Sequence, residues 1–159
     1  MATKTSFLSE VSTDMARIGI AGSGTWGTAL AIHLSKMGHE VRLWSALKDE
    51  IEEIGRKREH RNLPGVDIPE GISCISDDQE LCADADVVIL SVPSIYTRST
   101  AARLRPCIAK DQIVLCVAKG IEEDSLKTQT DICQEELPQA RVCVLSGPSH
   151  AEEVSRGLP

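Results

Sequence analysis

The chain has 159 residues, of which 42% are hydrophobic, 26% are charged and only 3% are aromatic. This length suits one domain, and the scarcity of aromatic side chains leaves Val, Ile, Leu and Ala to form the core, as in strands covered on both faces by helices. A net charge of −7 argues against a nucleic-acid partner or stable membrane contact, because both surfaces attract clustered Lys and Arg.

The six cysteines are scattered and include no C-x-x-C pair. No secretory segment is evident ahead of them, so we expect free thiols, a cytoplasmic location and no metal site. Cys116 and Cys143 lie within "IVLCVA" and "VCVLS", which we expect to be buried strands.

The first half of the chain alternates short apolar runs with helical patterns. Residues 1–14, rich in Ser and Thr, predict a flexible tail ahead of one domain over 15–159. We then expect, in order, a strand over 17–21, a helix over 26–37 closed by Gly38, a strand over 40–44, a helix over 47–58 and a loop over 60–71.

The second half contains three continuous apolar runs, 86–92, 113–118 and 142–146, which are typical of central parallel strands. Helices are expected between them, near 95–104 and 125–136. This alternation predicts a Rossmann-like, doubly wound α/β fold, with a mostly parallel sheet and helices on both faces. The sequence stops after "EEVSRGLP", where another strand is due, so we expect the domain to be incomplete at its C-terminus.

The most informative motif is "GSGTWG" at residues 22–27, a G-x-G-x-x-G between an expected strand and an expected helix. A second strand completes a βαβ unit of about thirty residues, which is the context that a dinucleotide-binding loop requires. Gly22 permits the tight turn, Gly24 lets the backbone approach a pyrophosphate, and Gly27 brings the helix close to the sheet. The helix N-terminus offers N–H groups to the phosphates.

The choice between NAD and NADP depends on the end of the second strand, where an Asp or Glu reads the ribose 2′-hydroxyl. Here Trp44-Ser45-Ala46 follows, and the first acid, Asp49, is expected inside the next helix. The missing carboxylate removes a repulsion of the 2′-phosphate, and Lys48 could attract that group. The sequence therefore favours NADP(H), or use of both cofactors.

Other polar residues lie where the carboxyl ends of strands are expected. The Lys119 ammonium suits an anionic substrate or a polarised carbonyl, although a solvated charge explains it equally well. Ser149 suits either a helix cap or a ligand contact. Trp26 is expected to face the ligand, and Tyr96 either packs on a helix or contacts the ligand. The histidines have no Asp or Ser partner at a telling spacing, so no His-based triad is expected.

Taken together, several pieces of the chain resemble the NAD(P)-dependent glycerol-3-phosphate dehydrogenases from about Ile18 onward. These pieces occur in family order: "IAGSGTWGTALA", "GHEVRLW", "NLPGVDIP", "SVPS", "AKGIE" and "LSGPSHAEEV". The alternatives are another Rossmann dehydrogenase of the 6-phosphogluconate or 3-hydroxyacid type, and a non-catalytic nucleotide-binding module.

The resemblance implies specific site residues. It places cofactor contacts at Gly22, Gly24, Thr25, Trp26, Gly27, Ala46, Tyr96, Lys119 and Ala151, and substrate contacts at Lys119, Gly147 and Ser149. Two positions depart from the family pattern, because Asn62 and His150 stand where the family usually has aromatic residues.

The resemblance also implies an activity, the NAD(P)H-dependent interconversion of dihydroxyacetone phosphate and sn-glycerol 3-phosphate in glycerophospholipid biosynthesis. In the family a helical second domain carries the acid/base lysine and an Arg-Asn pair that grips the substrate. These 159 residues contain no such domain, so we expect no catalytic residue in this chain and negligible turnover by it alone. A homodimer is possible in a full-length protein.

Overall fold

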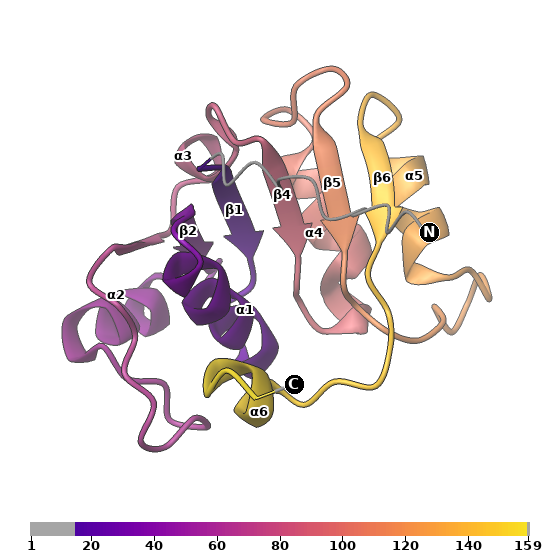
Figure 1. The fold of residues 1–159 in the computed structure, drawn as a ribbon. Helices are drawn as coiled ribbons and strands as arrows, with labels where there is room; N and C mark the ends of the chain where they lie inside the picture. The colour runs from indigo at the N-terminus through magenta and orange to yellow at the C-terminus, as the bar shows by residue number, and fades with distance from the viewer. Residues whose placement is uncertain (1–14, 159) are drawn as a thin grey trace, which may run out of the picture.

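The computed structural model describes residues 15–158, so the predicted tail at 1–14 and the last residue, Pro159, lie outside it. Its centre is one six-stranded sheet with the order β3-β2-β1-β4-β5-β6, in which every neighbouring pair is parallel (Figure 1). The strands are β1 (Arg17–Ala21), β2 (Glu40–Trp44), β3 (Ile72–Ile75), β4 (Val87–Leu90), β5 (Ile113–Cys116) and β6 (Arg141–Val144). The predicted Rossmann-like fold is confirmed.

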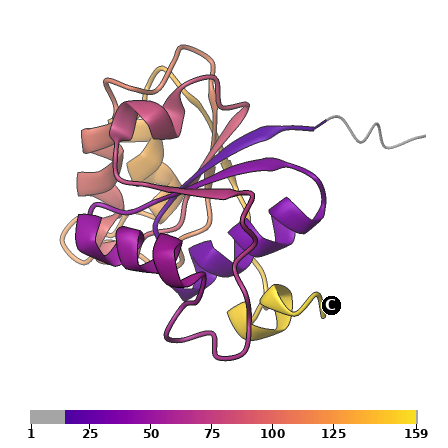
Figure 2. The same ribbon diagram turned by 90° about the vertical axis from the view of Figure 1, so that its left-hand side faces the viewer.

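Helices cover both faces of this sheet, as Figures 1 and 2 show. One face carries α1 (Thr25–Lys36) and α2 (Lys48–Lys57), and the short α6 (Ala151–Ser155) packs on α1. The other face carries α3 (Asp78–Cys82), α4 (Thr97–Leu104) and α5 (Gln129–Glu136), with the 3₁₀ turn η1 (Ser94–Tyr96) ahead of α4. None of the helices within 15–158 is both long and apolar enough to cross a membrane.

The apolar runs form strands because consecutive side chains enter different hydrophobic clusters. In β4, Val88 and Leu90 pack with α3, α4 and α5, whereas Ile89 between them packs on the α1 side. Since side chains alternate across a strand, a strand buried on both faces needs an apolar residue at every position. This explains why β4 is a continuous apolar run and β2, nearer the edge, contains Arg42.

One strand differs from the expectation of burial. β6 lies at the edge of the sheet, and Cys143 and Val144 within it are exposed, so the prediction that Cys143 lies in a buried strand is wrong. The chain leaves β6 and crosses to α1, where α6 packs, and no described helix covers this part of the sheet on the α1 side (Figure 1). Cys116, in β5, is buried as expected.

Several element boundaries also need correction. The expected helix over 125–136 begins only at Gln129, because Thr128 and Asp131 form a capping box, each side chain accepting the other's backbone N–H. The expected helix at 95–104 is the 3₁₀ turn followed by α4. The short elements β3 and α3 were not predicted from the sequence, although Asp77 caps α3 through a hydrogen bond from the Glu80 N–H.

Candidate nucleotide-binding site

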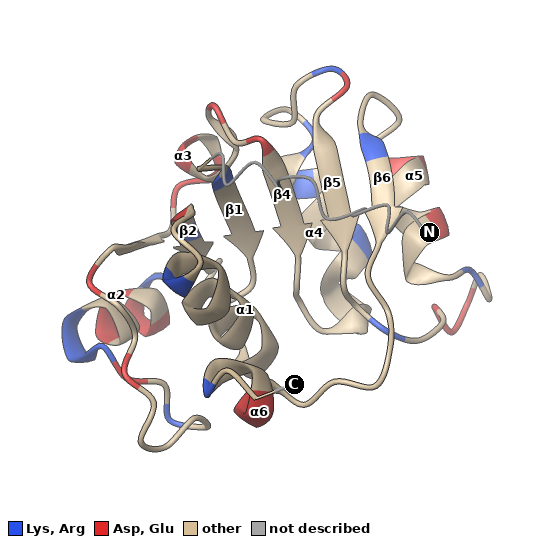
Figure 3. Cartoon of the chain, in the orientation of Figure 1, with Lys and Arg blue, Asp and Glu red and all other residues tan. Residues whose placement is uncertain are grey.

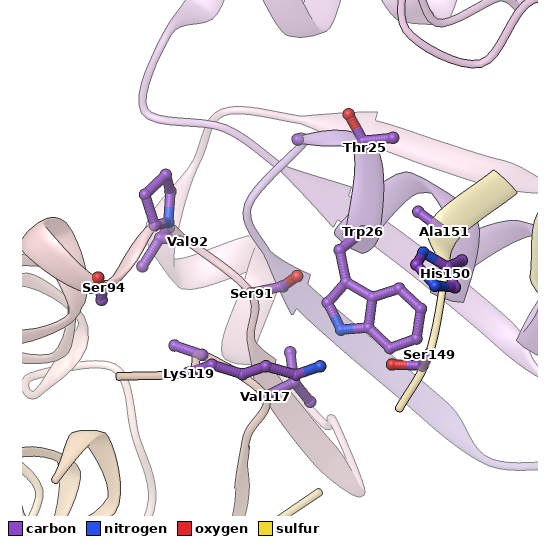
Figure 4. Close-up of a pocket in the computed structure, with 13 residues that line it drawn as sticks. Thr25, Trp26, Ser91, Val92, Ser94, Val117, Lys119, Ser149, His150 and Ala151 are labelled. Carbon is purple, nitrogen blue, oxygen red and sulfur yellow. The ribbon is translucent and has the colours of Figure 1, made fainter. Parts of the chain in front are cut away.

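A cavity of about 430 Å³ opens at the carboxyl ends of the central strands. It lies where the connections from β1 and β4 diverge, which is the topological switch point at which doubly wound sheets bind ligands. Four segments line it, one each after β1, β4, β5 and β6: Gly24, Thr25 and Trp26; Ser91, Val92, Pro93 and Ser94; Val117, Ala118 and Lys119; and Ser149, His150 and Ala151 (Figure 4).

The glycine loop folds so tightly that two of its glycines are sterically required. Gly22 has φ +126°, and a Cβ there would lie 2.7 Å from the Ser91 carbonyl oxygen. At Gly27 a Cβ would lie 1.9 Å from the carbonyl oxygen of Gly22. The turn out of β1 and the close approach of α1 therefore have the physical basis predicted from the sequence.

Gly24 plays a different part, because nothing lies within 4 Å of the position that its Cβ would occupy. It is the N-cap residue of α1, and no side chain within residues 15–158 caps that helix end. The first turn of α1 also carries no acidic residue. The backbone N–H groups and the positive end of the helix dipole consequently face the cavity, an arrangement that favours negative charge.

Two residues that were not predicted from the sequence, Glu50 and His60, contact Ser23 in this glycine loop. The Ser23 hydroxyl donates a hydrogen bond to the Glu50 carboxylate, with 2.9 Å between the oxygens. The buried His60 imidazole lies against the backbone of Ser23, whose carbonyl oxygen accepts a hydrogen bond from the Thr28 hydroxyl at 3.1 Å. Burial lowers the pKa of His60. Glu50 lies in α2 and His60 in the loop that follows it. Only the fold brings these residues next to the glycine loop, so no sequence spacing predicts the contacts.

Lys119 lies on the opposite wall, in the segment after β5. Its ammonium donates a hydrogen bond to the Gly147 carbonyl oxygen at 2.8 Å, and Figure 4 shows it directed toward the Trp26 indole and Ser149. Ser149 lines the cavity and His150 is the N-cap residue of α6, so Ser149 does not cap that helix.

The other predicted site residues occupy less direct positions. Gly22, Gly27 and Gly147 do not line the cavity, although the Gly147 carbonyl oxygen contacts Lys119, which does. Ala46 is exposed beyond the end of β2, away from the cavity lining. The Tyr96 side chain is 55% exposed and also lies outside the lining. The binding roles of all the predicted site residues remain predictions, and those of Ala46 and Tyr96 gain no support from the cavity lining.

The segment after β4 contributes four lining residues that were not assigned as site residues. Among them, the Ser91 hydroxyl is buried and has no hydrogen-bond partner within residues 15–158. An unpaired buried hydroxyl is costly, and this one adjoins the glycine loop at Gly27. The detectable signal was "SVP" directly after an apolar run, which places polar groups at a strand's carboxyl end.

Charged residues of both signs are spread over the fold. Lys and Arg are interspersed with Asp and Glu on the face in Figure 3. Across residues 15–158, no group of three or more His, Cys, Asp or Glu is arranged to hold a metal ion.

Comparison with known proteins agrees with this geometry. Residues 17–159 match the sequence model of the NAD-dependent glycerol-3-phosphate dehydrogenase N-terminus. The chain belongs to this family. It is 49% identical over 146 residues to a glycerol-3-phosphate dehydrogenase [NAD(P)+] of Agathobacter rectalis, covering 91% of this chain and 44% of the relative. A Fusobacterium nucleatum enzyme of the same name is 47% identical over 148 residues, again covering 91% of this chain and 44% of the relative.

A solved structure of the same family has the same architecture. The crystal structure of glycerol-3-phosphate dehydrogenase from Coxiella burnetii superimposes with a TM-score of 0.84 at 32% identity, covering 91% of this chain and 45% of that one. These matches favour the glycerol-3-phosphate dehydrogenases over the 6-phosphogluconate or 3-hydroxyacid type. The chain spans less than half the length of the family members it matches.

Proposed function

We propose that this chain is the nucleotide-binding part of an NAD(P)-dependent glycerol-3-phosphate dehydrogenase that interconverts dihydroxyacetone phosphate and sn-glycerol 3-phosphate. The observation that carries this proposal is the cavity in which the N-terminus of α1 faces Lys119, after β5, and Ser149, after β6. Gly24 leaves room for a pyrophosphate, and Lys119 supplies a cation for the substrate. A cytoplasmic location agrees with the free thiols.

In this proposal the N–H groups at Gly24 and Thr25 would hold the pyrophosphate of the cofactor, and Ser91–Ser94 and Lys119 would line the part of the cavity left for its nicotinamide. The cofactor would supply a hydride for the ketone carbon. Lys119 holds an oxygen of the substrate or cofactor, exchanging its present hydrogen bond to Gly147 for one to the ligand. Efficient reduction also needs a proton for the developing alkoxide, and the family resemblance assigns that task to a lysine of a second domain.

We further propose that NADPH is accepted at least as well as NADH. Ser45 and Ala46 follow β2 without a carboxylate. Glu50, the nearest acid to the glycine loop in α2, is engaged with Ser23. Lys48, exposed at the start of α2, is a cation within reach of the strand end, where a 2′-phosphate would lie.

A steady-state assay tests the assignment of roles. Oxidation of NADPH and NADH is followed with dihydroxyacetone phosphate, using this chain and a full-length relative such as the Agathobacter rectalis enzyme. We expect the chain to bind the cofactor but to turn over at least about a hundredfold more slowly, since general acid–base catalysis alone contributes on the order of 10²–10⁴. Equal turnover by the two proteins would refute the proposed division of roles.

A further inference from the structure

The segment that follows β5 is a compact loop closed by its own backbone. Ile121 and Thr128 form an antiparallel bridge, the Glu122 N–H donates to the Lys127 carbonyl at 2.9 Å, and the Leu126 N–H donates to the Glu122 carbonyl at 2.9 Å. We call residues 118–128 the Lys119 loop. The backbone hydrogen bonds that close this loop involve Glu122, whereas Lys119 lines the cavity.

One guanidinium fastens this loop to the rest of the molecule. In the first turn of α4, Arg98 donates from Nε to Glu122 Oε1 at 2.8 Å and from Nη2 to Glu122 Oε2 at 2.7 Å. It also reaches Glu136 Oε1 at 2.7 Å and Glu135 Oε2 at 3.1 Å at the end of α5. A fork of two parallel bonds fixes orientation as well as distance, so the guanidinium ties α4, α5 and the Lys119 loop together.

This contact joins two walls of the cavity. Arg98 is four residues beyond Ser94, which lines the wall after β4, and Glu122 is three residues beyond Lys119 on the wall after β5. The two walls approach each other at Gly120, where φ is +105° and a Cβ would lie 3.9 Å from the Ser94 hydroxyl. The glycine loop takes no part in the contact, so the pair acts on only one half of the cavity.

Stability alone gives a weak reason for such a network. The Arg98 side chain is 35% exposed and that of Glu122 25%, and ion pairs near the surface add little to folding. Ordering a loop before a ligand arrives, however, removes part of the entropic cost of binding. The benefit of the network is therefore expected in ligand affinity.

We propose that Arg98 is a positioning residue, which through its bidentate pair with Glu122 holds the Lys119 ammonium toward the nicotinamide half of the cavity. This inference rests on the proposed function, because it takes a nicotinamide dinucleotide as the ligand. Loosening the pair frees the Lys119 loop without disturbing the pyrophosphate site at Gly24. The consequence is a selective loss of affinity for ligands that reach the Lys119 wall.

The test compares two ligands by calorimetric titration of the full chain. NADH spans both halves of the cavity, whereas ADP-ribose lacks the nicotinamide and engages the glycine loop. The variants are Arg98→Gln and Glu122→Gln. The matched control is Arg103→Gln, since Arg103 lies on the same helix but pairs with Asp78 at 2.7 Å and covers the Trp44 ring, away from the cavity.

We expect Arg98→Gln and Glu122→Gln each to weaken NADH about fivefold, as for the loss of one or two ordered groups, and the double variant to weaken it no further. ADP-ribose affinity is expected to stay within about twofold of the wild type, and Arg103→Gln to change neither ligand. Thermal unfolding of each variant verifies that the chain is folded.

Two results would overturn the inference. One is unchanged NADH affinity in both Arg98→Gln and Glu122→Gln. The other is an equal loss for NADH and ADP-ribose, which indicates a purely structural role. If the wild-type chain binds neither ligand, the proposed function fails first and this inference fails with it, whereas normal wild-type binding with unaffected variants removes only the role of Arg98.

Discussion

The Lys119 ammonium donates a hydrogen bond to the Gly147 carbonyl oxygen across 2.8 Å, which joins the segments after β5 and β6. These two residues are 28 positions apart in the sequence, and they meet because parallel strands deliver their carboxyl ends to one edge of the sheet. This bond places the Lys119 ammonium at the cavity wall. A ligand oxygen can take the place of the Gly147 carbonyl oxygen as its acceptor.

Replacing this lysine tests its role in binding. Lys119→Gln is expected to weaken NADH binding about tenfold, or roughly 1.4 kcal/mol, because a hydrogen bond from a charged donor is lost. The thermal midpoint is expected to change little, since the side chain is exposed. Lys110→Gln, at an exposed site before β5, is the control for charge. Calorimetric titration giving equal NADH affinity for both variants would remove Lys119 from the site.

Gly24 and Gly27 differ in the space around the position that a Cβ would occupy. Gly24→Ala is expected to fold normally, because no protein atom lies near its Cβ position, yet to bind NADH at least about tenfold more weakly because the methyl group occupies the place of the pyrophosphate. Gly71→Ala, which also has open space around it, is the control. The measurements are NADH titration and the urea midpoint. Wild-type affinity in Gly24→Ala would contradict the assignment of the phosphate site.

Close packing at Gly27 predicts that a larger residue at this position lowers the stability of the protein. Gly27→Ala would place its methyl group 1.9 Å from the Gly22 carbonyl oxygen. The backbone must shift, so we expect the free energy of unfolding to fall by roughly 1–3 kcal/mol, as for other overpacked sites. Urea denaturation followed by circular dichroism measures this change. A midpoint as high as that of Gly24→Ala would show that α1 can move away from β1 at little cost.

Cofactor choice is tested by dissociation constants for NADPH and NADH. We expect NADPH to bind as tightly as NADH or more tightly, and Lys48→Gln to weaken NADPH by roughly threefold while sparing NADH, the size of an exposed ion pair. The lysine's effect is expected to shrink at high salt, because exposed charges are screened. Much tighter binding of NADH by the wild type would show that the missing acid after β2 does not set the preference.

The Arg98 network predicts a small pH dependence of stability. Hydrogen bonds from Arg98 and Ser125 lower the pKa of Glu122 to about 2, from a usual value of 4.5. A carboxyl group with a lowered folded pKa stabilises the protein above its unfolded pKa and loses this effect as the pH falls through the folded value. The stability difference between the wild type and Glu122→Gln is therefore expected to be full at pH 6 and to vanish between pH 4.5 and 2. Urea midpoints measure it, and a difference independent of pH would exclude the ionised pair.

Much of the fold could be predicted because its causes are local. The apolar run of β4 is continuous since both faces of the sheet are covered there, and Gly38 ends α1 in a left-handed conformation with φ +92°. The edge position of β6 could not be read from "VCVLS", because burial depends on what packs against a strand and not on its own composition. The brief β3 and α3 offer too few residues for a periodic signal.

The site was predictable to a similar extent. Gly24 and Lys119, which line the cavity, were predicted from a motif and from strand ends, which are signals within short segments. Glu50, His60 and Arg98 were missed, since each acts through a contact made across the fold. These residues act on the site from outside the cavity. Their partners are distant in the sequence, so no motif or spacing predicts the pairs.

The central claim is that this chain holds one nicotinamide dinucleotide between its glycine loop and Lys119. Titration with NADPH and NADH, followed by quenching of Trp26 fluorescence, tests it most directly because the Trp26 indole lines the cavity whereas Trp44 is buried elsewhere. The account predicts saturable one-to-one binding, with the quenching lost in Trp26→Phe and the affinity lost in Gly24→Ala. Absence of saturable binding of either cofactor by the folded chain would contradict it.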